Sequence, residues 1–235
     1  MRQFAVVWIS ILLFFIIGCN EEPKLKARIN LIVGEVKIKS TDSKLRNASV
    51  GDLLLRNDQI ITLEDSSVDL LLPGGSVLRL KENSDLLLAD LSAQTNLHLK
   101  SGNLLMAVKK MQNNETMQIT TPTTIAAVRG TSFSISNDSN TIAVLTGKLL
   151  IQRDNDSVVA EPMKQVKTDE KRLSTTTLSQ NKIIELKEIL SIHGVDSLDD
   201  YNEMQKNWAT SALSSNSPVL QVPRAELPSF QVKEK

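Results

Sequence analysis

The side chains with the widest chemical repertoire in this chain are one cysteine and two histidines. His98 stands between Leu97 and Leu99 in an alternating run, a pattern typical of a solvent-facing position on a strand. His193 precedes Gly194 at the end of a helical pattern, where an imidazole stabilises the helix C-terminus. The two histidines fall in separate elements, so their spacing predicts no metal site, and no nucleophile-elbow motif supports a Ser-His-Asp site.

Two further groups have the residue types of a functional site without the spacing. Asp199 and Asp200 are adjacent, so on a helix they point in different directions, which suits the first turn better than paired acid-base catalysis. Gly74, Gly75 and Ser76 lack the lysine and the helix that follow a phosphate-binding loop, and we expect a hairpin turn there. The sequence therefore predicts a protein that is not an enzyme, with no catalytic residue, metal or cofactor.

Cys19 is the only cysteine, so no intrachain disulfide and no cysteine-based metal site can form. It follows shortly after an apolar run, Phe4–Ile17. This run comes after Arg2 and is shorter than a typical membrane-spanning helix. The order Ile17-Gly18-Cys19 resembles a bacterial lipoprotein processing site. We therefore predict a signal peptide over residues 1–18 and a lipid on Cys19. The alternative is an uncleaved N-terminal anchor with an incidental thiol.

Lipidation of Cys19 predicts where the protein resides. Two acyl chains suffice for stable anchoring, because each buried methylene contributes about 0.8 kcal/mol. Residues 19–28 then form a short tether between membrane and protein. The predicted location is the cell envelope after export, on the periplasmic face or the cell surface. The outer membrane is favoured over the inner one, since Asn20 rather than Asp follows the cysteine.

Charge and aromatic content argue against several classes of ligand. The chain has 27 basic and 27 acidic residues, so it lacks the basic field that nucleic acid requires. The aromatic residues beyond the apolar N-terminal run are Phe133, Tyr201, Trp208 and Phe230. So few rings argue against a stacking platform for bases and against a sugar-binding cleft.

The elements that must position any site are predicted to be strands. Between Arg28 and Leu173, short alternating apolar runs are cut by turn residues at a spacing of about ten residues. Examples are Val36 to Ile38, Val68 to Leu72 and Leu97 to Leu99. Leu, Ile and Val fill the core without large rings, which favours thin stacked layers. We predict a mainly β body over residues 29–173, either β-solenoid-like or a flattened β-sandwich.

The stretch from Ile119 to Ile135 is predicted to organise this body. Two strand-like runs, Met117 to Thr121 and Thr131 to Ile135, flank a proline and a glycine. Gly130 permits a tight bend. Phe133 and Ile135 then face the core of a half-buried strand, and Ser132 and Ser134 lie on its other face. Arg129 stands beside this bend among small and apolar residues. It is either a surface arginine whose stem lies along the sheet or a contact for a partner.

Several motifs in a fixed order carry a family resemblance. They are Val50-Gly51-Asp52-Leu53, Ile60-Ile61-Thr62, Gly74–Leu80, Thr121-Pro122, Val128-Arg129-Gly130-Thr131-Ser132-Phe133 and Val144–Leu149. Together they resemble the FecR domain family, whose members are extracytoplasmic all-β modules named for an iron-transport regulator. The resemblance covers roughly Ile29 to Val159 and implies that this part is such a domain.

The C-terminal part has a helical period instead. We predict a polar linker from Lys164 to Thr177 and then a helix that Ser179 can cap and that Gly194 ends. The apolar stripe of this helix consists of Ile183, Leu186 and Leu190, with Ile184 and Ile189 beside it. Leu198, Tyr201, Met204 and Trp208 then recur at helical spacing. We predict an antiparallel helical hairpin over residues 178–213 and a flexible tail over residues 214–235, where Pro218, Pro223 and Pro228 preclude a continuous helix.

Two functions are consistent with these predictions. The first is a membrane-tethered, non-catalytic protein-interaction or scaffold module of the cell envelope. Its candidate partner contacts are Arg129, Tyr201 and Trp208. The second, implied by the resemblance, is a sensory component that regulates transmembrane signalling through another membrane protein. Only Met1 to Gln3 precede the apolar run, so we expect no cytoplasmic segment that binds a sigma factor. An envelope glycan hydrolase lacks a recognisable acid pair.

Overall fold

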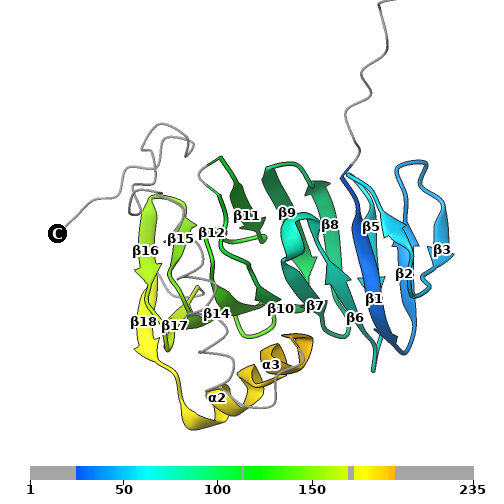
Figure 1. Cartoon of the computed structure of the whole chain (residues 1–235). Coiled ribbons are helices and arrows are strands. Elements are labelled where there is room, and N and C mark those ends of the chain that lie inside the picture. Colours follow the sequence, from blue (N-terminus) through cyan, green and yellow to red (C-terminus); the bar gives the residue numbers. More distant parts are fainter. Residues whose placement is uncertain (1–24, 113, 169–171, 194–235) are drawn as a thin grey trace, which may run out of the picture.

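Two nine-stranded β-sheets lie face to face in the computed structural model, which describes residues 25–112, 114–168 and 172–193 (Figure 1). Sheet A has the order β18-β17-β14-β13-β10-β7-β6-β1-β4, and sheet B has the order β16-β15-β12-β11-β9-β8-β5-β2-β3. The strands of sheet A are β1 (Ala27–Val33), β4 (Leu53–Leu54), β6 (Ser67–Leu71), β7 (Val77–Leu80), β10 (Asn103–Ala107), β13 (Ser132–Ser136), β14 (Thr141–Thr146), β17 (Lys164–Lys167) and β18 (Ser174–Thr177). Those of sheet B are β2 (Val36–Lys39), β3 (Leu45–Asn47), β5 (Gln59–Thr62), β8 (Asp85–Asp90), β9 (Gln94–Ser101), β11 (Thr116–Thr120), β12 (Ile125–Val128), β15 (Leu149–Arg153) and β16 (Asp156–Ala160).

The chain builds both sheets together as it advances from one edge to the other. Successive strands or hairpins belong alternately to sheet A and sheet B. Both sheets are therefore extended in the same direction as the chain proceeds. Almost all neighbouring strands are antiparallel, and the pair β9 and β11 is parallel. This architecture confirms the mainly β prediction. The body consists of two flat sheets, and successive strands are added along one axis, as in a solenoid.

The core lies between the sheets and is almost entirely aliphatic. Every second residue of most strands points inward, as in β6, where Val68 and Leu70 are buried and their neighbours are partly exposed. Phe133 is the largest fully buried side chain among the described residues. This alternation follows from the pleat of a strand, which sends successive side chains to opposite faces.

The central strands of sheet A are buried on both faces, which corrects one expectation. β13 was predicted to be half-buried, with Ser132 and Ser134 facing solvent. Both serines are buried, and Ser134 lies in register between Leu105 and Ala143. Leu105 and Ala143 form a second apolar cluster together with residues of the C-terminal helices. The helices therefore cover this outer face, which the alternation within β13 could not reveal.

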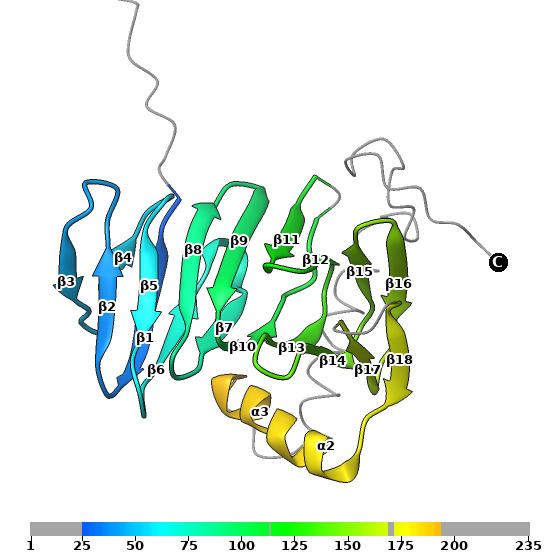
Figure 2. The ribbon, with the colours of Figure 1, turned by 180° about the vertical axis from the view of Figure 1, so that it is seen from behind.

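Two short helices, α2 (Gln180–Leu186) and α3 (Glu188–His193), lie against sheet A (Figure 2). Ser179 caps α2 as predicted, since its side chain accepts a hydrogen bond from the Lys182 amide at 3.2 Å. The predicted single helix is divided at Lys187. Leu186, Ile189 and Leu190 are buried, whereas Ile184 is 60% exposed and does not belong to the buried stripe.

The segment predicted to be a polar linker is part of the sheet. β17 and β18 form an antiparallel hairpin at the edge of sheet A, with Lys164 paired to Thr177. Its polar composition reflects the exposed position of β18 at that edge, where only one side of the strand has a ladder partner. The second predicted helix and the tail lie outside the described residues.

Candidate interaction surface

The Arg129-Gly130-Thr131 motif forms a closed corner between β12 and β13. The Thr131 hydroxyl lies 2.8 Å from the Lys148 carbonyl and 3.3 Å from the Arg129 carbonyl, and both oxygens can accept its proton. Gly130 and Gly147 both have positive φ, and a Cβ on Gly147 would lie 2.6 Å from the Gly130 carbonyl oxygen. The motif is therefore explained by the backbone conformation that this corner requires.

The same corner occurs twice more at other strand ends. The Ser66 hydroxyl donates to the Glu64 carbonyl at 2.9 Å and accepts from the Glu35 amide at 2.8 Å. Gly34 precedes this amide, and a Cβ there would collide with the Ser66 hydroxyl.

At the third corner, Ser84 donates to the Glu82 carbonyl at 2.9 Å and accepts from the Asn103 amide at 2.9 Å, while a Cβ on Gly102 would collide with the Ser84 hydroxyl. In each case the hydroxyl residue follows a residue with positive φ, here Asn83. The repeat was missed in the sequence because its three members share only a Ser or Thr and a distant glycine.

Arg129 occupies the position in its corner that Glu64 and Glu82 occupy in the others. All three residues contribute a carbonyl to the corner, so the motif places no demand on their side chains. The Arg129 side chain is partly exposed. The geometry thus accounts for the glycine and the threonine, and Arg129 stays a candidate contact on the basis of its sequence position alone.

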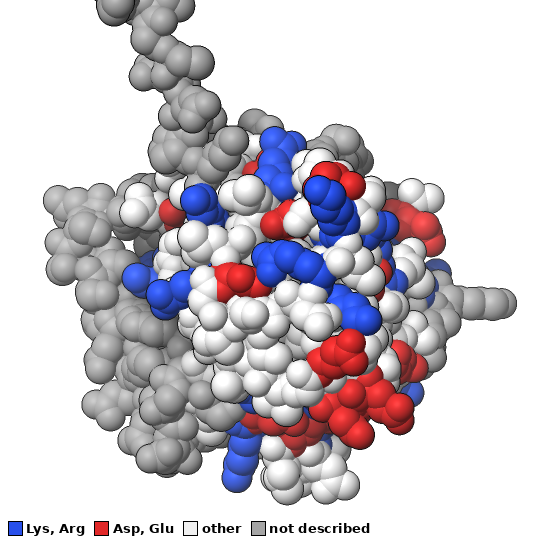
Figure 3. All heavy atoms as spheres, turned by 90° about the vertical axis from the view of Figure 1, so that its right-hand side faces the viewer, with Lys and Arg blue, Asp and Glu red and all other residues white. Residues whose placement is uncertain are grey.

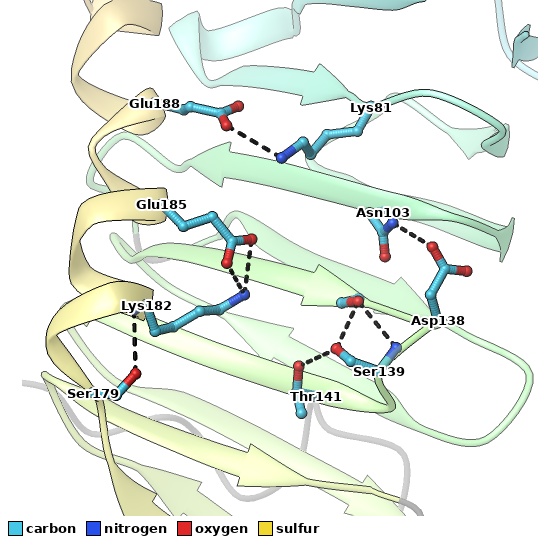
Figure 4. A network of polar contacts seen from close by, with 10 residues as sticks. Lys81, Asn103, Asp138, Ser139, Thr141, Ser179, Lys182, Glu185 and Glu188 are labelled. Carbon is cyan, nitrogen blue, oxygen red and sulfur yellow. Dashed lines mark hydrogen bonds and ion pairs between the residues drawn. The ribbon is translucent and has the colours of Figure 1, made fainter. Parts of the chain in front are cut away.

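Charged pairs hold α3 and its neighbouring strands on sheet A. Arg79 and Asp69 form a two-pronged ion pair at 2.7 Å across β6 and β7, and Lys81 reaches Glu188 of α3 at 3.2 Å (Figure 4). The hydrogen bonds that Arg79 donates to Asp69 raise the pKa of Arg79 above its ordinary value, against the opposing effect of burial. These pairs have a structural explanation and do not form a reactive site.

The outer face of sheet A becomes an exposed apolar surface beyond the helices. We call Leu31, Val33, Val50 and Leu53 the edge patch, and their exposed fractions are 45%, 51%, 62% and 52%. They lie on β1, on β4 and in the loop that precedes β4. The end-on view in Figure 3 shows a broad uncharged area bordered by Lys and Arg on one side and by Asp and Glu on the other.

The edge patch lies where both sheets end. β4 pairs with β1 over only two residues, and β3 has a ladder partner on one side alone. Arg46 of β3 contacts Asp52 at 2.6 Å and ties the two edges together. Burial opposes ionisation of Asp52, but hydrogen bonds from Arg46 and the Ser49 amide outweigh it, so the pKa of Asp52 falls below its ordinary value. Exposed strand edges beside apolar side chains are typical of a surface that binds another protein.

One hollow in the described surface is smaller than most ligand sites. A hollow of about 180 Å³ lies among the loops and is lined by Leu25, Lys109, Lys110, Met111 and Glu115, among others. Sites for drug-sized molecules usually occupy roughly 300 to 1,000 Å³. Within the described residues, no group of three or more His, Cys, Asp or Glu side chains could hold a metal ion.

Of the residues singled out in the sequence for their chemistry, Arg129, His98 and His193 lie in the described part of the chain. His193 is the last residue of α3, in agreement with the predicted position at a helix C-terminus. His98 is on β9 and partly exposed, as predicted. Cys19, Tyr201 and Trp208 lie outside the described residues, so their roles stay predictions. Among residues that the structure describes, no helix combines the length and apolar character needed to cross a membrane.

Comparison with known proteins supports the motif analysis. Residues 58–150 match the model of the family described as FecR protein, which confirms the predicted resemblance for this region. No curated protein matches the chain. Two crystal structures of "a putative anti-sigma factor" from Parabacteroides distasonis ATCC 8503 align with TM-scores of 0.48 at 15% sequence identity. The alignments cover 54% of this chain and 62% of that protein, which is less than two thirds of its length.

Proposed function

We propose that this chain, whose residues 58–150 match the FecR family, is an exported lipoprotein that takes part in envelope signalling by binding another protein. The observation that carries the proposal is the edge patch, where Leu31, Val33, Val50 and Leu53 are exposed beside two open strand edges. Burial of such side chains supplies the main favourable term in protein association.

The character of the edge patch favours a protein as its partner over the other classes of ligand considered. The small hollow, the balanced overall charge and the few aromatic residues argue against a bulky small molecule, nucleic acid and sugar in turn. A strand edge flanked by apolar side chains accepts a strand or an apolar face of another protein. Arg129, Tyr201 and Trp208 remain candidate contacts for such a partner.

A second candidate function is that of an envelope scaffold. The rigid two-sheet body and the predicted lipid on Cys19 would equally suit a protein that links a membrane to structural components. The identity of the bound partner separates the two functions. A membrane-spanning signalling protein favours the regulatory role, and a structural envelope component favours the scaffold.

Cross-linking in intact cells tests the proposal. We expect the tagged chain to capture an envelope protein, and we expect Val33→Glu with Leu53→Glu to abolish that capture, because two buried charges would be left unpaired in the interface. Ile184→Glu is the matched control, since Ile184 is also an exposed aliphatic residue but lies on α2. Equal capture by all three chains would contradict a role for the edge patch.

A further inference from the structure

The two ends of the strands differ in charge, although the net charge of the chain is zero. The ladders of sheet A place Ala27, Leu71, Val77, Ala107 and Ser132 in one row, at the end where the first strand begins. We call the loops at this end the tether end, since the chain enters the body there. The loops at the opposite strand ends form the far end.

Positive charge at the tether end is directed to solvent. Lys26, Lys39 and Lys109 are exposed, and none of them has an acidic partner within ion-pair distance among the described residues. Lys39 pairs in the ladder with Gln59, and Lys109 follows β10, which places both at this end. Lys110 adds a further exposed cation beside Lys109.

The acidic residues at the tether end are occupied by local structure. Asp58, Asp90 and Glu115 accept hydrogen bonds from the amides of Leu55, Ser92 and Gln112 at 2.8, 2.7 and 2.8 Å. Asp42 and Glu161 pair with Lys44 and Lys148 at 3.4 and 2.9 Å. Asp90 also pairs with Arg56 at 3.6 Å. The hydrogen bonds leave these carboxylates negative, but the lysines without an ion pair among the described residues (Lys26, Lys39 and Lys109) outnumber the acidic side chains without one (Asp58 and Glu115), so the unpaired charge at this end is mainly positive.

The far end has the opposite character. Glu64 and Asp65 lie in its loop between β5 and β6, Glu82 lies between β7 and β8, and Asp138 and Asp154 lie in its later turns. Glu64, Asp65 and Asp154 have no basic partner among the residues that the structure describes. Figure 3 shows this polarity, with Lys and Arg concentrated in its upper half and the largest group of Asp and Glu at the lower right.

We propose that the tether end lies against a bilayer surface that contains anionic lipid. The inference rests on the lipid anchor of the proposed function for its geometry, because the stretch from Cys19 to Ala27 reaches about 28 Å at most when fully extended. A short tether holds the tether end near the headgroups, where lysines are attracted to anionic lipid within about one Debye length of 8 Å. The acidic far end is repelled by the same surface.

Apolar side chains at the tether end complement these cations. Leu25 is 46% exposed and lines the hollow together with Met111, Lys109 and Lys110. An apolar residue flanked by lysines suits the boundary between headgroups and acyl chains. The edge patch lies on a lateral face, on β1 and β4, so membrane contact at the tether end leaves it open to a protein partner.

Vesicle binding by the unlipidated mature chain tests the inference independently of the anchor. The chain spans residues 19–235 with Cys19→Ser, and the vesicles contain phosphatidylcholine alone or with phosphatidylglycerol. We expect binding to the anionic vesicles that weakens as salt is raised. Lys39→Glu with Lys109→Glu is expected to reduce the partition coefficient at least tenfold, because the attraction of each lysine is replaced by repulsion.

The matched control changes the net charge equally at the far end. Lys100 and Lys167 are exposed residues of β9 and β17 near the far end, and Lys100→Glu with Lys167→Glu is expected to alter the partition coefficient less than twofold. Circular dichroism checks that both double variants fold. Equal losses in the two variants, or no preference for anionic vesicles, would overturn the proposal. Partner capture and processing at Cys19 are separate measurements, so their failure would count against the proposed function alone.

Discussion

At the scale of single residues, the family-like motif has a structural explanation. Thr131 is 1% exposed, and its hydroxyl is enclosed by the carbonyl oxygens of Arg129 and Lys148. Ser66 and Ser84 donate equivalent hydrogen bonds to backbone carbonyls at two other strand ends. A glycine is required opposite each hydroxyl, because the approaching backbone leaves no room for a Cβ. The motif therefore identifies a fold and does not by itself locate a binding site.

Removal of the Thr131 hydroxyl should destabilise the body. Thr131→Val keeps the shape of the side chain but deprives the Arg129 and Lys148 carbonyls of this donor, which should lower the free energy of unfolding by about 0.5 to 1.5 kcal/mol. Thr123→Val is the matched control, since Thr123 is exposed in a neighbouring turn and its side chain makes no hydrogen bond among the described residues. Urea unfolding measures both. A Thr131 variant as stable as the control would refute the structural role of the corner.

At the scale of elements, the C-terminal helices complete the β body. Leu186, Ile189 and Leu190 pack on Leu105, Ala107, Ala143 and Leu145 of β10 and β14. The sequence predicted the Ser179 cap and most of the apolar stripe from helical spacing. It could not predict the break at Lys187 or the exposure of Ile184, because both depend on the shape of the sheet beneath the helices.

Two aliphatic residues of α2, Leu186 and Ile184, should differ sharply in their contribution to the free energy of unfolding. Leu186→Ala removes a fully buried side chain from the helix-sheet cluster, and we expect a loss of about 2 to 5 kcal/mol in the free energy of unfolding. Ile184→Ala removes a side chain that is 60% exposed and should cost less than about 0.5 kcal/mol. Thermal or urea unfolding of the two variants provides the comparison. Similar losses would mean that α2 does not pack on sheet A through Leu186.

At the scale of the whole molecule, three surfaces have separate tasks in our proposals. The tether end faces the membrane, the edge patch binds a protein, and the helices cover the outer face of sheet A over β10 and β14. Two thin layers of aliphatic strands allow this separation of surfaces, because each sheet has one face toward the core and one face outward. The zero net charge conceals the difference between the two ends.

The anchor at Cys19 makes a prediction for the complete protein. Cys19→Ala should move most of the chain from the membrane fraction to the soluble fraction after export, because two acyl chains are lost. Cys19→Ser should behave alike, since neither side chain can form the thioether. Fractionation and the mass of the N-terminal peptide measure the change. Full membrane retention of the variants, together with an unmodified N-terminal peptide in the unsubstituted protein, would exclude the lipid anchor.

The sequence by itself determined the type of most described elements and most of the aliphatic core, although residues 164–177 were predicted to be a linker and form strands. Alternation within strands, glycines at bends and the Ser179 cap are local, so they can be recognised without knowledge of distant contacts. The ordered motifs between residues 58 and 150 were enough to indicate the family.

Only the tertiary structure decided what lies on each surface. The burial of Ser132 and Ser134, the inclusion of residues 164–177 in sheet A and the shared corners of Ser66, Ser84 and Thr131 all involve segments far apart in the sequence. The edge patch and the opposite charges of the two strand ends are likewise invisible in composition. They arise because the ladders bring many loops to the same end of the body, where their charges and apolar groups act together.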